Sequence, residues 1–191
     1  MSYKDRSFTD IFAKELATFS DPEVAIIVNK TFERVLERHK WEPASSSGKY
    51  HPKCDLGDGG LIRHSKIVFQ FADELLRATP ILKSEYDVIR AAALLHDMFK
   101  YKTAEEEHTS FEHPTDAANA IKEANPNSPK ADEIARLVSK HMGIWNTSSY
   151  HPDITLPVPE KFDEWVLHYA DLLASRRYID FTFDDDGNLV I

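Results

Sequence analysis

Three histidines and one aspartate stand three or four residues from apolar residues in segments that read as helices: His64, His96, His141 and Asp171. Leu137 precedes His141 by four residues, and Leu167 precedes Asp171 by four. Because residues at this spacing share a helix face, we expect all four polar side chains to point toward the core. An ionised aspartate in such a place is costly unless it is paired or bound to a cation.

A single inward histidine is usually a hydrogen-bonded core residue. Four such residues on four different helices favour a metal site, because helical bundles build metal sites from side chains that project inward from facing helices. A mixed set of imidazole and carboxylate ligands suits Fe, Mn, Zn or Co. The sequence therefore predicts a metal centre inside a helical bundle.

The adjacent pair His96 and Asp97 is the most specific feature. Neighbours within a helix point about 100° apart and cannot reach one ion. Here the apolar run Ala91–Leu95 comes before the pair and a polar segment comes after it. This places the pair at the end of a helix, where both side chains can turn toward the same point.

The chain resembles the HD-domain superfamily of metal-dependent phosphohydrolases in the stretches Gly59–His64, Ala91–Lys100, Phe111–Pro114, Ser139–Gly143 and Leu167–Leu172. The resemblance implies an all-α bundle and a first metal held by His64, His96, Asp97 and Asp171. It implies a second metal held by His113 and His141, with Asp97 as the bridging and catalytic carboxylate. It also implies that Lys100 lies near the scissile phosphate.

Two positions depart from the family pattern. Phe99 stands where many members have glycine before the lysine, and Met142 follows His141 where several binuclear members have a second histidine. The implied cofactor is one or two divalent ions per chain, with Mn, Fe, Co, Ni or Zn expected and Mg also compatible. The second ion is the less specific part of this prediction.

Candidate substrate residues lie on both sides of the predicted metal-binding helices: Ser46, Ser47, Lys49, Tyr50, His51, Arg176 and Arg177. The hydroxyl groups and backbone amides of the first loop could hold phosphate oxygens. A flexible linker is the other interpretation of that loop. The two arginines follow Asp171 by five and six residues. They either reach the substrate or stabilise the end of a helix. Trp145, on a loop after His141, either packs against the protein or stacks on a base.

Helices are expected near residues 9–19, 22–40, 61–78, 84–98, 114–124, 129–142 and 161–178. Asp21 and Ser128 each precede a proline and read as N-caps. Ser84 and Asp87 resemble a capping box. The tail 179–191 reads as a small β-hairpin with aspartates in its turn. The fold class is therefore all-α, a bundle of six or seven helices with a short C-terminal hairpin. We expect one HD-type domain over residues 1–191, with N-terminal helices in 1–40 and the metal-binding core in about 59–177.

Composition limits the partners. The 191 residues carry 23 basic and 32 acidic side chains, a net charge of −9, which disfavours long nucleic acid but not a small anionic substrate. One cysteine and no apolar run above five residues predict no internal disulfide and no membrane span. The first residues lead into no apolar stretch, so we expect no secretory signal and a cytoplasmic location. The sequence leaves a homo-oligomer open.

The expected activity is hydrolysis of a phosphoester or phosphoanhydride bond of a nucleotide or similar small phosphorylated substrate by metal-activated water. Three alternatives stay open. One is a di-iron oxygenase of the HD type, although the chain lacks the further His-x-x-Ala-Lys-Arg-Tyr element of such oxygenases. Another is a 3'-5' exonuclease or phosphodiesterase on short oligonucleotides. The last is a regulatory module with a vestigial site.

Overall fold

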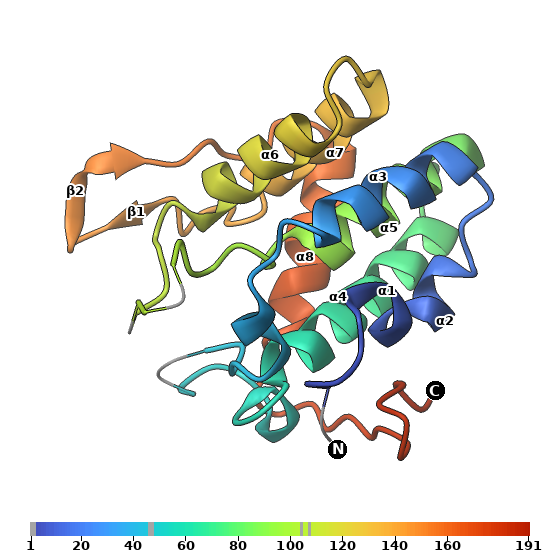
Figure 1. The fold of residues 1–191 in the computed structure, drawn as a ribbon. Coiled ribbons are helices and arrows are strands. Elements are labelled where there is room, and N and C mark those ends of the chain that lie inside the picture. Colours follow the sequence, from blue (N-terminus) through green and yellow to red (C-terminus); the bar gives the residue numbers. More distant parts are fainter. Residues whose placement is uncertain (1–2, 46–47, 104, 107) are drawn as a thin grey trace.

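The computed structural model describes residues 3–45, 48–103, 105–106 and 108–191 (Figure 1). The described residues form eight α-helices: α1 Phe8–Ile11, α2 Ala13–Leu16, α3 Pro22–Phe32, α4 Gly60–Ala78, α5 Tyr86–Leu95, α6 His113–Ala124, α7 Pro129–Ser139 and α8 Phe162–Ala174. Three short 3₁₀ turns join them: η1 Glu37–Lys40, η2 Lys53–Asp55 and η3 Lys83–Glu85. The prediction of an all-α fold is confirmed.

Two N-terminal helices differ from their predicted bounds. The expected helix over 9–19 is divided at Phe12 into α1 and α2, which is one reason why the helices outnumber the six or seven predicted. The Phe12 side chain is fully buried and stacks on Phe32 with ring centroids 5.3 Å apart. The helix expected to reach Lys40 ends instead at Phe32, where i to i−3 hydrogen bonds from Arg34 and Val35 tighten the chain into a turn.

The predicted N-caps Asp21 and Ser128 both accept a backbone N–H in the first turn of their helices. The predicted capping box of Ser84 and Asp87 is wrong, because α5 begins at Tyr86 and Asp87 lies in its first turn. The Asp87 carboxylate instead accepts the backbone N–H groups of Ser20 and Asp21, both at 2.7 Å. It therefore holds the start of α3 against α5 across the core.

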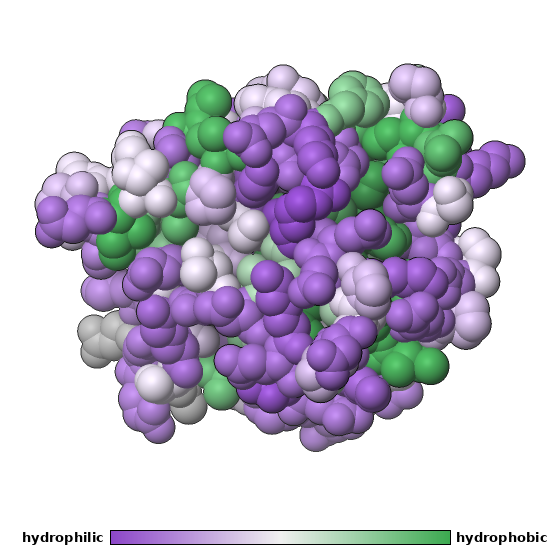
Figure 2. Space-filling model, turned by 90° about the horizontal axis from the view of Figure 1, so that it is seen from above, coloured by the Kyte–Doolittle hydropathy of each residue, from purple (hydrophilic) through white to green (hydrophobic). Residues whose placement is uncertain are grey.

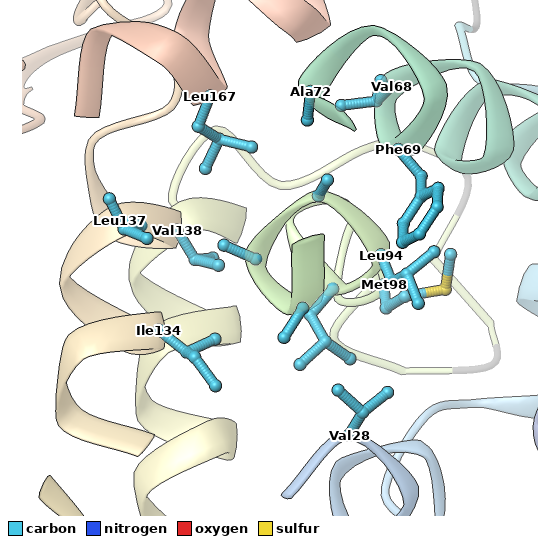
Figure 3. Packing of buried hydrophobic residues seen from close by; sticks show 14 of the residues in the cluster. Val28, Val68, Phe69, Ala72, Leu94, Met98, Ile134, Leu137, Val138 and Leu167 are labelled. Atoms are coloured by element: carbon cyan, nitrogen blue, oxygen red, sulfur yellow. The ribbon is translucent and has the colours of Figure 1, made fainter. Parts of the chain in front are cut away.

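Helix α5 is the centre of the bundle, and α3, α4, α7 and α8 all pack on it. Its residues Ala91, Ala92 and Ala93 are completely buried, as expected for a helix surrounded by others. Figure 3 shows apolar side chains of these neighbours converging on α5, among them Val28, Val68, Ile134 and Leu167. The C-terminal end of α5, with His96 and Asp97, is therefore held in a fixed position.

A two-stranded antiparallel sheet, β1 Thr147–Ser148 and β2 His151–Thr155, lies where a loop was expected. This hairpin projects from the side of the bundle near α6 (Figure 1). It was not predicted because its exposed residues lack the alternation of a half-buried strand. The C-terminal tail, expected to form a hairpin, makes one isolated antiparallel bridge between Phe183 and Leu189, closed by a turn at Gly187.

The surface in Figure 2 is mostly hydrophilic, with apolar side chains in separate small groups. None of the described helices combines the length and the apolar character that a membrane span requires. The first described residues and the C-terminal tail lie near one another (Figure 1), and the Arg6 guanidinium donates to the backbone oxygen of Asp186 at 2.9 Å.

Candidate metal centre

Five helices bring the predicted ligands to one place. His64 lies on α4, His96 caps the end of α5 and Asp97 follows it, His113 begins α6, His141 comes two residues after α7, and Asp171 lies on α8. The four histidines are almost completely buried, with the most exposed of them at 6%. The expectation that His96 and Asp97 stand at a helix end is met, since α5 ends at Leu95.

Every one of these four histidines has its Nδ1 atom anchored. The Nδ1–H groups of His96, His113 and His141 donate to the backbone oxygens three residues earlier in the chain, at 2.7 to 2.8 Å. The Nδ1–H of His64 donates to the carboxylate of Asp55 at 3.0 Å. This arrangement leaves each Nε2 to face the centre, which is how metal-binding histidines are oriented in proteins.

The Nε2 atoms converge on the carboxylates of Asp97 and Asp171. His96 Nε2 lies 3.3 Å from Asp97 Oδ2, and His64 Nε2 lies 3.8 Å from the same oxygen and 3.0 Å from Asp171 Oδ1. The other oxygen of Asp97, Oδ1, lies 3.2 Å from His113 Nε2.

His141 completes the second side, with its Nε2 3.7 Å from Asp97 Oδ1. The donor atoms therefore form two groups that share Asp97, one with His64 and His96 and one with His113 and His141. A carboxylate with one oxygen on each side has the arrangement expected of a bridging ligand between two ions.

The charge balance around His64 favours a cation. Burial disfavours a charged ring, but the carboxylates of Asp55 and Asp171 outweigh burial and raise the pKa of His64 to about 10. Burial alone would raise the pKa of Asp171, but the hydrogen bond from His64 holds that pKa below its ordinary range. In the absence of a metal, a proton on His64 supplies positive charge that a bound ion would otherwise bring.

The charge balance around Asp97 also favours a cation. Burial works to raise the pKa of Asp97, but His96 and Lys100 beside it hold that pKa well below its ordinary value. Burial, together with His96 and His113, lowers the pKa of His141 to about 3. An ionised carboxylate next to a neutral imidazole is the protonation pattern that metal binding requires.

One buried atom directly supports the fit of these residues to a metal. His96 Nε2 has no hydrogen-bond partner among the described residues, although Asp97 Oδ2 lies within 3.3 Å of it. An unpaired polar nitrogen in a protein core is costly. An ion ligated by His96 and its neighbours would satisfy this atom, and the imidazole and carboxylate donors suit a divalent transition metal.

Lys100 lies beside this centre. Its ammonium is 2.6 Å from Asp97 Oδ2 and donates to the backbone oxygen of Ala44 at 2.8 Å. The side chain also lines the cavity that leads to the centre. Since an ammonium has three donors, one remains for a substrate oxygen.

The cavity has a volume of about 440 Å³, and Lys100 and five of the six predicted metal ligands line it, all except His96: His64, Asp97, His113, His141 and Asp171. Of the predicted substrate residues, Tyr50, His51 and Arg176 also line it. Lys49 and the exposed Arg177 are not in its lining, and Ser46 and Ser47 lie outside the described residues. Adjacent arginines at a helix end point in different directions, so only one of the pair reaches the cavity.

Sequence reasoning missed Asp55. This residue of η2 is completely buried and lies between His51 and His64, with 3.0 Å from its Oδ2 to the Nδ1 of each. No periodic pattern marks it, because it lies on a short turn inside a segment that reads as a loop. A buried aspartate bonded to a histidine at a metal centre typically orients that ligand.

Behind His141, a second histidine fixes the backbone. His168 Nδ1 donates to the His141 backbone oxygen at 2.8 Å. Gly143 makes this contact possible, since a Cβ there would lie 2.2 Å from the His168 ring and its φ of +59° favours glycine.

The fold and the centre together define a helical metal-binding domain with a His and Asp donor set. The HD domain family model matches residues 61–178, which is more than half of the chain, and the chain therefore belongs to the HD domain family. The family and the donor set indicate a metal-dependent hydrolase.

A curated relative is a tRNA (cytidine(56)-2'-O)-methyltransferase from Picrophilus torridus, 30% identical over 131 residues. The match covers 66% of this chain and 35% of that protein, so the chain spans about a third of the relative's length. No solved structure matches the chain.

Proposed function

We propose that this chain is a metal-dependent phosphohydrolase that cleaves a phosphoester or phosphoanhydride bond of a nucleotide or similar small phosphorylated substrate. One observation carries the proposal. Asp97 meets histidine nitrogens at both of its carboxylate oxygens and the Lys100 ammonium at Oδ2, at the wall of a cavity open to a small molecule. Ligand sites on the scale of a few hundred Å³ are typical for such substrates.

In this proposal His64, His96, Asp97 and Asp171 hold a first divalent ion, and His113, His141 and Asp97 hold a second. Bound divalent ions supply hydroxide near neutral pH and neutralise charge on phosphoryl oxygens. The protein supplies the fixed donor positions, since each histidine is oriented by its own Nδ1 hydrogen bond.

Lys100 and Arg176 supply positive charge for the substrate. Asp97 and the Ala44 oxygen hold the Lys100 ammonium in place, so that its remaining donor can meet a phosphoryl oxygen without reorganisation. The Arg176 guanidinium is positioned by its Nε donation to the Leu172 oxygen at 2.9 Å and lines the same cavity.

Aromatic side chains supply the remaining wall. Tyr50 and Trp145 both line the cavity and stay partly exposed, at 57% and 46%. An exposed indole at a ligand site can stack on the base of a nucleotide. Trp145 is itself supported by the His168 ring, with centroids 5.5 Å apart.

The methyl transfer named for the relative is not part of this proposal. The matched region is a minor share of that protein. The donor set of the cavity suits a cation and a phosphate.

The experiment is a turnover panel of nucleotides, cyclic nucleotides, dinucleoside polyphosphates and short oligonucleotides with Mn, Fe, Co, Ni and Mg, with and without oxygen. We expect release of phosphate or a nucleoside phosphate from a small substrate, independent of oxygen. Oxygen-dependent turnover would contradict the proposal in favour of an oxygenase. Metal binding without any hydrolysis would favour a regulatory module.

A further inference from the structure

The segment that precedes α4 places a further histidine at the wall of the cavity. We infer that His51 is a catalytic residue of the proposed hydrolase, which accepts a proton from the attacking water at its Nε2, and that Asp55 is the positioning residue that orients it. This inference rests on the proposed function for the reaction. Neither residue belongs to the motifs that identified the metal centre.

The geometry begins at one carboxylate oxygen. Oδ2 of Asp55 lies 3.0 Å from Nδ1 of His51 and 3.0 Å from Nδ1 of His64. The two imidazole rings are 4.9 Å apart between centroids and inclined at 62°. One buried oxygen therefore sets the orientation of both rings, one at the metal centre and one at the cavity wall.

The backbone keeps Asp55 in this position. Its N–H donates to the Pro52 oxygen at 3.1 Å, and its own oxygen accepts the N–H of Ala44 at 3.0 Å. A Cβ at residue 60 would lie 2.0 Å from that same oxygen, so the first residue of α4 must be glycine for η2 to pack this closely. A carboxylate on such a fixed backbone makes a preorganised support.

The same Ala44 also accepts the Lys100 ammonium through its backbone oxygen. Ala44 and Asp55, joined by their backbone hydrogen bond, thus link Lys100, the proposed ligand His64 and the wall residue His51.

His51 presents its other nitrogen to the cavity. Its side chain is mostly buried yet lines the cavity, and its Nδ1 is turned to Asp55. None of the described residues makes a hydrogen bond to its Nε2. An Nδ1–H held by a carboxylate leaves Nε2 as a lone pair, which is the arrangement of a histidine general base.

The water oxygen forms a bond to phosphorus, the bond from phosphorus to the leaving oxygen breaks, and the leaving oxygen keeps that electron pair. The water proton passes to His51 Nε2 and then to solvent, and the leaving oxygen takes a proton from solvent. No oxidant or further reactant is needed. Asp55 stays ionised and stabilises the protonated ring.

His51, Asp55 and His64 also lie close enough to form a third metal-type group. Their arrangement is already accounted for by two hydrogen bonds to one oxygen, so we assign no ion there. Loss of a bound ion in a His51 variant would overturn this assignment together with the proposed role of His51.

The test compares His51→Ala and Asp55→Asn with His151→Ala, a histidine variant in the exposed hairpin. Turnover is measured with an aryl phosphate and an alkyl phosphate, and Mn²⁺ affinity is measured by titration. We expect His51→Ala to lower kcat about a hundredfold for both esters, with KM and Mn²⁺ affinity nearly unchanged. Added imidazole should restore part of the rate. His151→Ala should behave as wild type.

Asp55→Asn should affect both histidines, so kcat should fall and Mn²⁺ affinity should weaken about tenfold or more. Wild-type kcat in His51→Ala, or a lost rate that imidazole does not restore, would overturn the role of His51. So would a loss confined to the alkyl ester, which would make His51 an acid for the leaving group.

The same measurements distinguish failure of the proposed function from failure of the roles of His51 and Asp55. If wild type hydrolyses no ester, that proposal fails and the role of His51 fails with it. Unchanged Mn²⁺ affinity in Asp55→Asn would overturn the positioning role of Asp55 whatever the activity. If Asp55→Asn does not fold, as judged by circular dichroism, imidazole rescue of His51→Ala decides the inference.

Discussion

Two clusters of buried charge among the described residues are balanced in different ways. In the first, the Lys66 ammonium on α4 meets both carboxylate oxygens of Glu15 at 2.9 and 3.0 Å and the Ile11 oxygen at 2.8 Å. All three of its donors are satisfied. Burial lowers the pKa of Lys66 against the pull of Glu15, so this pair is a closed structural contact between the N-terminal helices and the bundle.

The second cluster, the metal centre, is not closed. Two aspartates and four histidines converge in it, Lys100 contacts only one of them, Asp97, and His96 Nε2 has no partner among the described residues. Backbone oxygens hold the Nδ1 atoms of His96, His113 and His141, and Asp55 holds that of His64, so that the Nε2 atoms face the centre. The difference teaches that burial and charge alone do not mark a functional site, whereas fixed donors that lack a partner in the protein do.

The largest effect is expected at Asp97, which both groups of donors share. Asp97→Ala should remove bound metal and abolish turnover, because neither group keeps its carboxylate. The fold should survive, since the variant relieves a buried charge. Plasma mass spectrometry and turnover on the same sample would check it. Full activity in this variant would exclude the centre.

Breaking the Glu15–Lys66 pair should lower stability without removing metal. Glu15→Ala leaves Lys66 buried without a counter-charge and should cost about 3 to 5 kcal/mol of unfolding free energy, measured by urea denaturation. Metal content should stay at the wild-type level. The matched control replaces both residues, Glu15→Leu with Lys66→Met, and should be nearly neutral. If Glu15→Ala alone is as stable as wild type, the ion pair does not stabilise the fold.

Lys100→Ala should separate charge from ligation. An ammonium is no metal ligand, so the ions should remain, while kcat should fall on the order of a hundredfold through weaker stabilisation of phosphoryl charge. Turnover beside metal content measures both quantities. Loss of metal in this variant would mean that Lys100 organises the ligands instead of the substrate.

The smallest effect concerns His39, a buried histidine outside the centre whose Nε2 also lacks a partner among the described residues. Burial lowers its pKa from 6.5 to about 4, in contrast to His64, where carboxylates raise it. At a pH between the two pKa values of His39, the unfolded chain binds a proton there and the folded chain does not. The contribution of His39 to stability therefore falls as the pH drops through this range. From about pH 7 to about pH 5 the loss should be about 2 kcal/mol.

Urea denaturation of wild type and His39→Gln across this pH range isolates the contribution of His39. The variant should lose less stability on acidification than wild type. Parallel curves would show that His39 is protonated equally in both states. His39 also shows that an unpaired buried nitrogen alone does not identify a metal site, because converging carboxylates are needed as well.

Much of this arrangement could be predicted from local sequence. The N-caps at Asp21 and Ser128 and the position of His96 and Asp97 at a helix end follow from short-range rules. Asp55 could not be predicted, because it reaches His64 only through the close packing of η2 on Gly60. Asp87 was misassigned for a similar reason, since its carboxylate accepts the N–H groups of Ser20 and Asp21 just before α3 instead of capping its own helix. Short-range patterns do not encode such tertiary contacts.

The most direct test of the central claim is the number of divalent ions that the wild-type chain binds. The protein would be dialysed against a chelator, then titrated with Mn²⁺ and assayed by plasma mass spectrometry. Two donor groups that share Asp97 predict between about one and about two ions per chain, with the His113 and His141 side lost first because it has fewer protein ligands. Fewer than about one ion in ten chains at saturating Mn²⁺ would contradict the account.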